Sequence, residues 1–185
     1  MPRAGLSAAA VVEAALAVVD EHGEGGLTLA AVAQRTGVAT PSLYKHVAGL
    51  GELRTLLGAR VLEDMAEQFT RAVLGHSGDD AVVALMRAYR AYVQAHPARY
   101  AAAPLDPLHD PALAAAGGKL LEVVFGALRA YDLEQSEAIH AIRCLRAVAH
   151  GFASLEAGGG FGLPEDLDQT YDQLVNVLVE ALPRS

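Results

Sequence analysis

Apolar residues recur along the first part of the chain at the spacing of helical faces. The first stripe lies within residues 6–22 and consists of Val11, Val12, Ala15, Leu16 and Val19. Ser7 can cap the start of this helix, and Gly23 is placed to end it. Thr28 can cap a second helix over 28–35, whose apolar face consists of Leu29, Val32 and Ala33.

Two further helices are expected after Gly37. Thr40 is a candidate N-cap and Pro41 suits the first helical position, so the pattern predicts a helix from Pro41 to Val47. The run Ala48–Gly49–Leu50–Gly51 interrupts it. A long helix over 52–74 follows, and its apolar stripe consists of Leu53, Leu56, Leu57, Val61, Met65 and Phe69.

Beyond residue 74 the pattern predicts more helices with short connections. They lie at 79–95, 113–131 and 133–156, and a last helix is expected to begin at Pro164. Three prolines between positions 104 and 111 exclude one regular helix there. Because the 133–156 helix is apolar nearly all round, it needs covering on several sides.

Composition agrees with an all-α chain. Hydrophobic residues make up 52% of the 185 residues and charged residues 19%, which excludes a disordered chain. Aromatic residues are 5% with no Trp, which disfavours a large β-sandwich. No uncharged stretch is long enough to cross a bilayer, and no apolar signal core begins the chain. We therefore expect a cytoplasmic protein with no membrane partner.

The second and third helices form a candidate helix-turn-helix. Ala33 lies four residues before Gly37, where the two helices approach so closely that a larger side chain would collide. Val38 and Leu43 are then placed to fill the core between them. A helix held in this way can lie in the major groove of DNA with its N-terminal half at the base edges.

The third helix presents side chains that can bond nucleic acid. Its outward residues are Thr40, Ser42, Tyr44, Lys45 and His46. Their hydroxyl, phenol, ammonium and imidazole groups can bind phosphates or base edges. No carboxylate occurs between Gly25 and Gly51 to repel the phosphates.

The charge balance argues mildly against DNA, since the formal net charge is -8. The acidic residues of 1–48 lie in the first helix and the loop after it. The basic residues Arg35, Lys45, Arg54 and Arg60 lie in or near the part of the chain expected to face DNA. We therefore expect a local basic patch. A buried helical hairpin with no DNA role, and Tyr44 as an ordinary core residue, remain as alternatives.

Residues 6–57 carry a set of motifs that matches a known domain. The motifs are Leu27–Thr28–Leu29, Val32–Ala33, the run from Gly37 to Val47, Leu50 and Glu52–Leu53. With the apolar-Tyr-x-His signature of the third helix, this region resembles the DNA-binding domain of the tetracycline-repressor (TetR) family. Later segments are similar to the terminal helices of one subgroup, namely Arg143, Arg146, His150–Gly151–Phe152 and Gly159–Gly160–Phe161–Gly162.

The resemblance implies a homodimer that represses transcription from a double-stranded DNA operator until a small-molecule effector fills the larger domain. Carried over by position, the DNA contacts would be Thr28, Thr40, Ser42, Tyr44, Lys45 and His46, and Pro41 and Leu43 complete the predicted DNA-binding set. Family members often place a lysine near the start of the fourth helix. The segment 48–51 has none, although backbone N–H groups there could replace its phosphate contact.

The bundle after residue 48 is expected to hold the effector and the dimer contacts. An apolar pocket with a few polar tips would be lined from Met65, Phe69, Met86, Tyr89, Phe125, His140 and Cys144. The last two helices carry enough apolar surface for a four-helix dimer interface, formed from Leu145, Val148, Phe152, Tyr171, Leu174 and Leu178. Ordinary core packing is the alternative for all of these stripes.

Metal and catalytic chemistry are less well supported. His140 and Cys144 lie four residues apart on one helical face, a spacing that suits a soft metal, but no second pair completes a site. His150 has no accompanying nucleophile motif or carboxylate cluster. We therefore expect no metal, no cofactor and no catalytic residue.

Together these patterns predict an all-α chain with a three-helix helix-turn-helix DNA-binding head, residues 1–48, and a helical-bundle ligand-binding and dimerisation domain, residues 49–185. The expected function is that of a transcriptional regulator, a repressor released from a palindromic operator by a small apolar or amphipathic ligand. The alternative is an α-helical enzyme or small-molecule-binding module that does not bind DNA.

Overall fold

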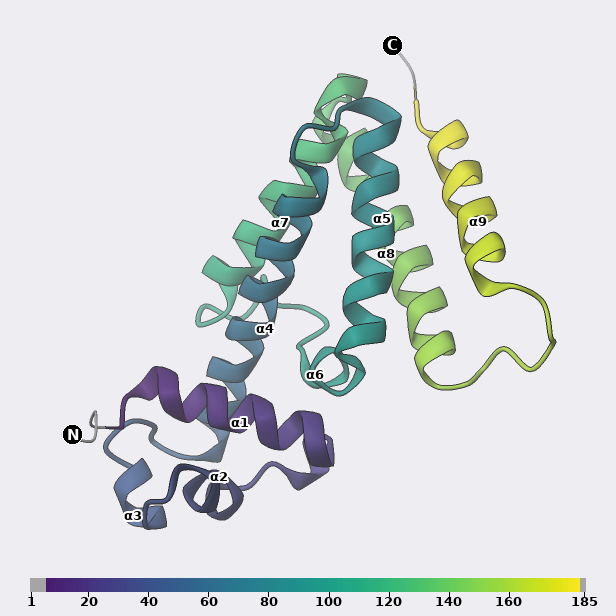
Figure 1. Cartoon of the computed structure of the whole chain (residues 1–185). Coiled ribbons are helices and arrows are strands. Elements are labelled where there is room, and N and C mark those ends of the chain that lie inside the picture. The colour runs from purple at the N-terminus through teal and green to yellow at the C-terminus, as the bar shows by residue number, and fades with distance from the viewer. Residues whose placement is uncertain (1–5, 184–185) are drawn as a thin grey trace. The chain divides into compact units, whose positions relative to one another are not determined.

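A computed structural model of the chain describes residues 6–183, and every regular element within that range is helical (Figure 1). The all-α prediction is confirmed. The α-helices are α1 (Ala8–His22), α2 (Leu29–Thr36), α3 (Thr40–Leu43), α4 (Leu50–Val73), α5 (Gly78–Ala95), α6 (Pro97–Ala102), α7 (Ala114–Leu128), α8 (Gln135–Ala157) and α9 (Leu167–Ala181). Two 3₁₀ turns, Glu24–Gly26 and Arg129–Tyr131, complete the set. None of the helices between residues 6 and 183 has the length and apolar character needed to cross a membrane.

The helices pack as two compact units. Among the described residues, the first consists of 6–63 together with 98–118, and the second of 64–97 together with 119–183. Helices α4 and α7 each begin in the first unit and end in the second. Packing groups the start of α4 with the N-terminal helices. The predicted functional boundary after residue 48 is a different division and stays a prediction.

Local capping signals explain where α1 and α2 begin and end. The hydroxyl of Ser7 accepts a hydrogen bond from the Ala10 N–H at 3.2 Å, and that of Thr28 accepts one from the Ala31 N–H at 3.1 Å. Gly23 ends α1 at a φ of 68°, a conformation that favours glycine. These predicted caps are confirmed.

Both ends of α3 and the start of α9 differ from the prediction. Helix α3 spans only Thr40–Leu43, and the extended residue before it is Ala39, so the predicted Thr40 cap is wrong. The end predicted at Val47 is also wrong, since the N–H groups of Lys45 and His46 donate three residues back in a turn, to the Ser42 and Leu43 carbonyls at 3.4 and 2.8 Å. Helix α9 begins at Leu167 rather than Pro164.

The later start of α9 has a local cause. The Asp166 carboxylate accepts hydrogen bonds from the N–H groups of Asp168 and Gln169, at 2.8 and 3.4 Å, and so caps the helix. The residues between Pro164 and this cap stay outside the helix.

In the first unit, the proline-rich segment packs against glycines. A Cβ atom on Gly58 of α4 would lie 2.9 Å from Pro104, and one on Gly117 of α7 would lie 3.0 Å from Pro107. The missing side chains therefore make room for the proline rings. Residues 104–111 form no regular helix, as the prolines predict.

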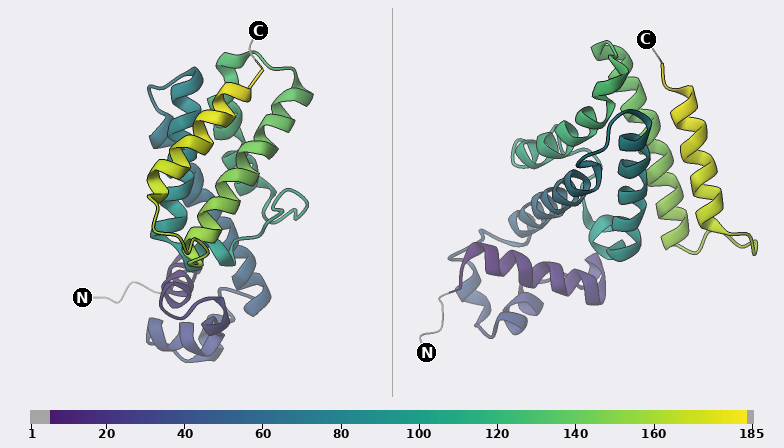
Figure 2. Two further views of the ribbon diagram at one scale, coloured as in Figure 1. Left: turned by 90° about the vertical axis from the view of Figure 1, so that its right-hand side faces the viewer. Right: turned by 45° about the horizontal axis from the view of Figure 1, so that its top comes forward.

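In the second unit, α8 and α9 lie side by side and α5 packs against both (Figure 2). Their apolar faces form one core together with Leu128 of α7, Tyr131 of the second 3₁₀ turn and Leu182 after α9. The members from α5, α8 and α9 are Val82, Met86, Ala141, Leu145, Ala149, Phe152, Tyr171, Val175 and Val179. Helices α5 and α9 cover one side of α8, whereas His140, Arg143 and Arg146 are exposed, so the expectation that the 133–156 helix is covered on several sides is met only in part. Leu155 of α8 also remains exposed.

Candidate nucleic-acid interface

The turn between α2 and α3 is built around Gly37. This residue has φ 70° and ψ 28°, the left-handed conformation in which an L side chain is strained. Its N–H donates to the Gln34 carbonyl at 3.2 Å, and the Val38 N–H donates to the Ala33 carbonyl at 3.1 Å. This pair of bonds is the Schellman closure of a helix, and it turns the chain sharply into α3.

Behind the turn, small and apolar side chains bring α2 and α3 together. Ala33, Val32 and Leu43 are buried, as the expected close approach of the two helices requires. Leu43 exposes no side-chain surface, so this member of the predicted DNA-binding set packs α3 onto the head and cannot contact DNA through its side chain.

The rest of the predicted DNA-binding set reaches the surface. Tyr44 is 57% exposed, so the alternative that it is a core residue is wrong. Thr28, Pro41 and Lys45 are exposed, whereas Thr40, Ser42 and His46 are half-buried. The residues after α3 are therefore displayed by a turn rather than by the continuous helix that was predicted.

Thr28 already has a structural task. Its oxygen accepts the Ala31 N–H as the cap of α2, which leaves the hydroxyl hydrogen as a donor. A phosphate oxygen is a suitable acceptor for such a donor. The cap and a DNA contact are therefore compatible.

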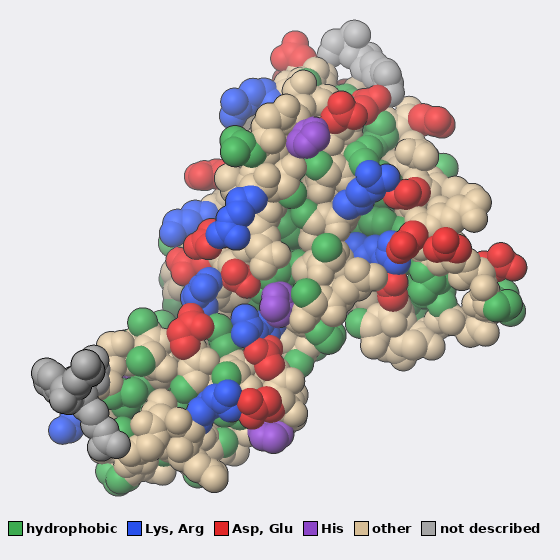
Figure 3. Space-filling view, in the orientation of Figure 1, with side chains coloured by type: hydrophobic (Ala, Val, Ile, Leu, Met, Phe, Trp, Pro, Cys, Tyr) green, Lys and Arg blue, Asp and Glu red, His purple; other side chains and the backbone are tan. Residues whose placement is uncertain are grey.

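The expected basic patch is only partly formed. Arg35 pairs with Glu21 at 2.8 Å, and on α4 Arg54 pairs with Glu24 and Arg60 with Glu13, at 3.7 and 3.0 Å. Of the four cations expected there, Lys45 alone forms no ion pair with the part of the chain that the structure describes. On the face drawn in Figure 3, basic and acidic side chains accordingly lie next to each other over the first unit.

The start of α4 is occupied by a carboxylate. The Ala48 N–H donates to the Glu52 side chain, so this backbone donor is taken. A negative charge stabilises a helix start but competes with a phosphate for the same position. Of the backbone N–H groups expected to replace the missing lysine in binding phosphate, the one of Ala48 is therefore already used.

The residues predicted to line a pocket lie in the second unit and differ in burial. Met65, Phe69 and Met86 are buried, and the rings of Phe69 and Tyr89 lie 5.6 Å apart. Phe125 is half-buried, whereas His140 and Cys144 are exposed on α8. Within residues 6–183 no group of three or more His, Cys, Asp or Glu is arranged to hold a metal. That these residues line a pocket stays a prediction.

The residues predicted for the dimer interface fall into two groups. Leu145, Phe152 and Tyr171 are buried within their own unit, and the Tyr171 hydroxyl donates to the Met86 carbonyl at 2.7 Å. The other group reaches the surface, where Leu174 is 37% exposed and Val148 and Leu178 are half-buried. The sequence pattern did not mark Val177, which is 63% exposed.

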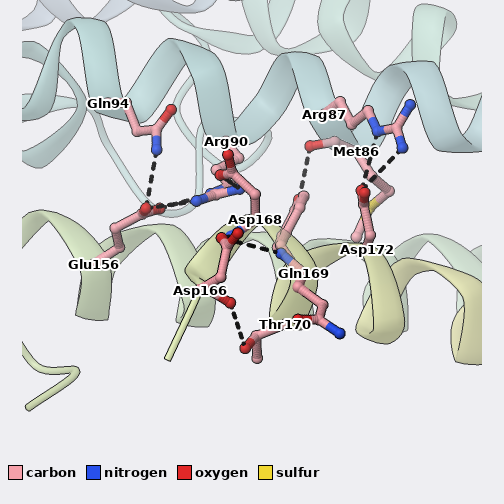
Figure 4. A network of polar contacts seen from close by, with 11 residues as sticks. Met86, Arg87, Arg90, Gln94, Glu156, Asp166, Asp168, Gln169, Thr170 and Asp172 are labelled. Atoms are coloured by element: carbon pink, nitrogen blue, oxygen red, sulfur yellow. Dashed lines mark hydrogen bonds and ion pairs between the residues drawn. The ribbon is translucent and has the colours of Figure 1, made fainter. Parts of the chain in front are cut away.

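A charged cluster on α5 was also not predicted from the sequence. Arg90 is only 8% exposed, and its guanidinium contacts Glu156 of α8 and Asp168 of α9 (Figure 4). One signal could have found it, because Arg90 follows Val82 and Met86 at four-residue steps on the buried face of one helix. An arginine at such a position needs acidic partners.

The similarity to known proteins extends over the whole chain. A family model described as Tetracyclin repressor-like, C-terminal domain, matches residues 82–178. The uncharacterized HTH-type transcriptional regulator Rv0681 of Mycobacterium tuberculosis is 36% identical over 88% of this chain and 74% of its own length. The uncharacterized HTH-type transcriptional regulator YobS of Bacillus subtilis is 33% identical over 98% of this chain and 95% of its own length.

A solved structure shares the fold. The TetR family protein ActR of Streptomyces coelicolor, in complex with (S)-DNPA, superposes with a TM-score of 0.73 at 20% identity, covering 97% of this chain and 98% of that one. The family model matches the C-terminal part of the chain, and both relatives are described as HTH-type transcriptional regulators. The chain belongs to the tetracycline-repressor (TetR) family of helix-turn-helix transcriptional regulators.

Proposed function

We propose that this regulator is a cytoplasmic, homodimeric repressor that binds a palindromic operator through α3 and leaves it when a small apolar or amphipathic ligand binds the second unit. The observation that carries the proposal is the exposed polar set around α3, held by the Gly37 turn in a segment without carboxylates. In a chain of net charge -8, such a gap suits a polyanionic partner.

The residues of this set have different roles in the proposal. Thr40 and Ser42 lie in α3 itself, where side chains meet base edges when the helix enters the major groove. Lys45 supplies sequence-independent attraction to phosphate, because it has no acidic partner of its own within the described chain. Tyr44 and His46 bond the backbone and so fix the position of the helix.

The ligand site is proposed within the second unit. Met65, Phe69 and Met86, with Tyr89 and Phe125, provide apolar and aromatic walls, and the exposed His140 and Cys144 supply polar groups at the rim. The (S)-DNPA complex of ActR supports a small-molecule site in this fold. The ligand acts by binding one arrangement of the two heads better than the other.

The dimer is proposed to form through α8 and α9. Leu174 and Val177 of α9 and Leu155 of α8 are exposed apolar side chains, with the half-buried Val148 and Leu178 beside them in the sequence pattern. An isologous contact of these helices buries the same surface on both copies. It also gives two reading heads for the two half-sites of a palindrome.

Fluorescence anisotropy tests the DNA-binding part of this proposal. Fragments that the protein selects from genomic DNA should bind more tightly than a random duplex of equal length, and rising salt should weaken both. If neither duplex binds at low salt, the proposal fails. The alternative of a ligand-binding module or enzyme without DNA would then be favoured.

A further inference from the structure

The guanidinium of Arg90 is bonded from several sides inside the second unit. Its Nε and Nη2 atoms donate to the two carboxylate oxygens of Glu156, at 2.7 and 2.6 Å, and Nη1 lies 2.8 Å from the Asp168 carboxylate. Gln94, one turn along α5, donates to the same Glu156 side chain at 2.9 Å. Figure 4 shows that these groups come from α5, α8 and the first turn of α9.

Aromatic rings cover the guanidinium. Its carbon lies 5.2 Å from the ring centre of Phe152 and 5.1 Å from that of Tyr171, within the range of cation–π contact. The Phe152 ring also contacts Phe161, at 4.8 Å between centres. Because Phe161 lies in the connection between α8 and α9, the cluster holds that connection as well as the helix ends.

The cluster joins the first turn of α9 and the last turns of α8 to α5. The connection between the two helices includes Gly158, Gly159, Gly160 and Gly162, so its backbone provides little rigidity of its own. Farther along α9, Val175 and Val179 pack into the core. Leu167 of the first turn also packs against this core, and the polar contacts that hold the turn are those of Asp168 with Arg90 and of the Asp166 cap.

The exposed apolar residues of α9 follow this anchored turn. Leu174 and Val177 lie on the same helix as Asp168, and Leu155 of α8 immediately precedes Glu156. A displacement of the first turn would therefore change the spacing between the exposed residues of α8 and those of α9. Complementary packing between two copies depends on that spacing.

We propose that Arg90 is a positioning residue for dimerisation, which holds α8 and α9 in the arrangement that a second copy of this chain recognises. The inference rests on the proposed homodimer. Removing Arg90 leaves Glu156 as a carboxylate that is only 14% exposed and has lost its cation, which favours a displacement of the helix ends that brings it to water. Asp168 is 82% exposed, so its removal is a milder change that keeps the buried pair.

Sedimentation equilibrium of the full chain measures the dimer Kd directly. R90M should raise the Kd by at least about tenfold, and D168N should raise it by a smaller, measurable factor, since it loosens only the α9 contact. R87M is the matched control, because Arg87 also joins α5 to α9, through Asp172 at 3.0 Å, but both side chains are about half exposed. We expect R87M to stay within about threefold of wild type.

Two further comparisons separate positioning from a general loss of stability. V82A truncates a fully buried residue of the same core and should lower the melting temperature without raising the Kd as R90M does. If R90M loses its helical circular dichroism, the dimer Kd of D168N alone tests the inference. Kd values for folded R90M and D168N within threefold of wild type would overturn the inference and leave the proposed dimer standing, whereas a monomeric wild type would overturn the dimer itself.

Discussion

At the scale of single residues, the sequence predicts what local chemistry decides. The caps at Ser7 and Thr28 and the left-handed turn at Gly37 each depend on neighbours three or four positions away, and all three were predictable. The four-residue spacing after Val82 and Met86 indicates that Arg90 is buried, but its partner Glu156 is 66 positions distant, so no local pattern identifies the pair. The same holds for Arg35, whose partner Glu21 lies 14 positions away in the sequence. Their ion pair reduces the basic patch.

Lys45 should contribute affinity that depends on salt rather than on sequence. In Lys45→Ala, binding to the selected operator and to a random duplex should weaken together, and the slope of log K against log salt should become shallower by roughly 1 per subunit. Arg35→Ala is the control, because Arg35 is already paired with Glu21, and its slope should change less. An unchanged slope in Lys45→Ala would show that this side chain does not contact the DNA backbone.

Glu156 should make stability depend on pH in the acid range. Its hydrogen bonds from Arg90 are the main cause that holds its pKa below the ordinary value of 4.5. A depressed folded-state pKa adds stability that is complete above the unfolded value and is lost as pH falls below about 4.5 through the folded value. In urea titrations, Glu156→Gln should therefore lose stability less steeply below this pH than wild type does. An equal dependence of stability on pH in the two proteins would contradict the contact between Arg90 and Glu156.

At the scale of elements, helix existence was predictable and some helix ends were not. The α3 end differs because Lys45 and His46 donate to carbonyls three residues back, and the α9 start differs because Asp166 caps the helix. The irregular course of 104–111 follows from its prolines. Its packing partners Gly58 and Gly117 do not follow from any local pattern, since they lie on other helices.

The contact of α4 with the proline-rich segment should be sensitive to one added methyl group. In Gly58→Ala the new Cβ would lie 2.9 Å from the Pro104 ring, which cannot rotate away, so the free energy of unfolding should fall by about 1–3 kcal/mol. Gly51→Ala is the control on the same helix, where a Cβ meets nothing within 4 Å. Thermal unfolding compares the two, and equal melting temperatures would show that the segment moves aside freely.

At the scale of the whole molecule, we propose that the exposed residues around α3 act in a dimer of this chain. The sequence predicted the helical architecture and the family. It did not predict that residues 98–118 pack with the head, because contacts such as the one between Arg99 and Asp20, at 2.6 Å, join positions 79 apart. Pocket, dimer and DNA contacts are proposals that depend on molecules other than the single chain.

The spacing between the two half-sites tests whether a dimer of this chain reads the operator through α3. A dimer with two reading heads requires half-sites about one turn of DNA apart, ~34–36 Å. Inserting about 5 base pairs between the half-sites of the selected operator turns one half-site to the opposite face of the duplex, so anisotropy should show affinity falling to the random-duplex level. Undiminished affinity after this insertion would contradict a dimer that reads a palindrome through α3.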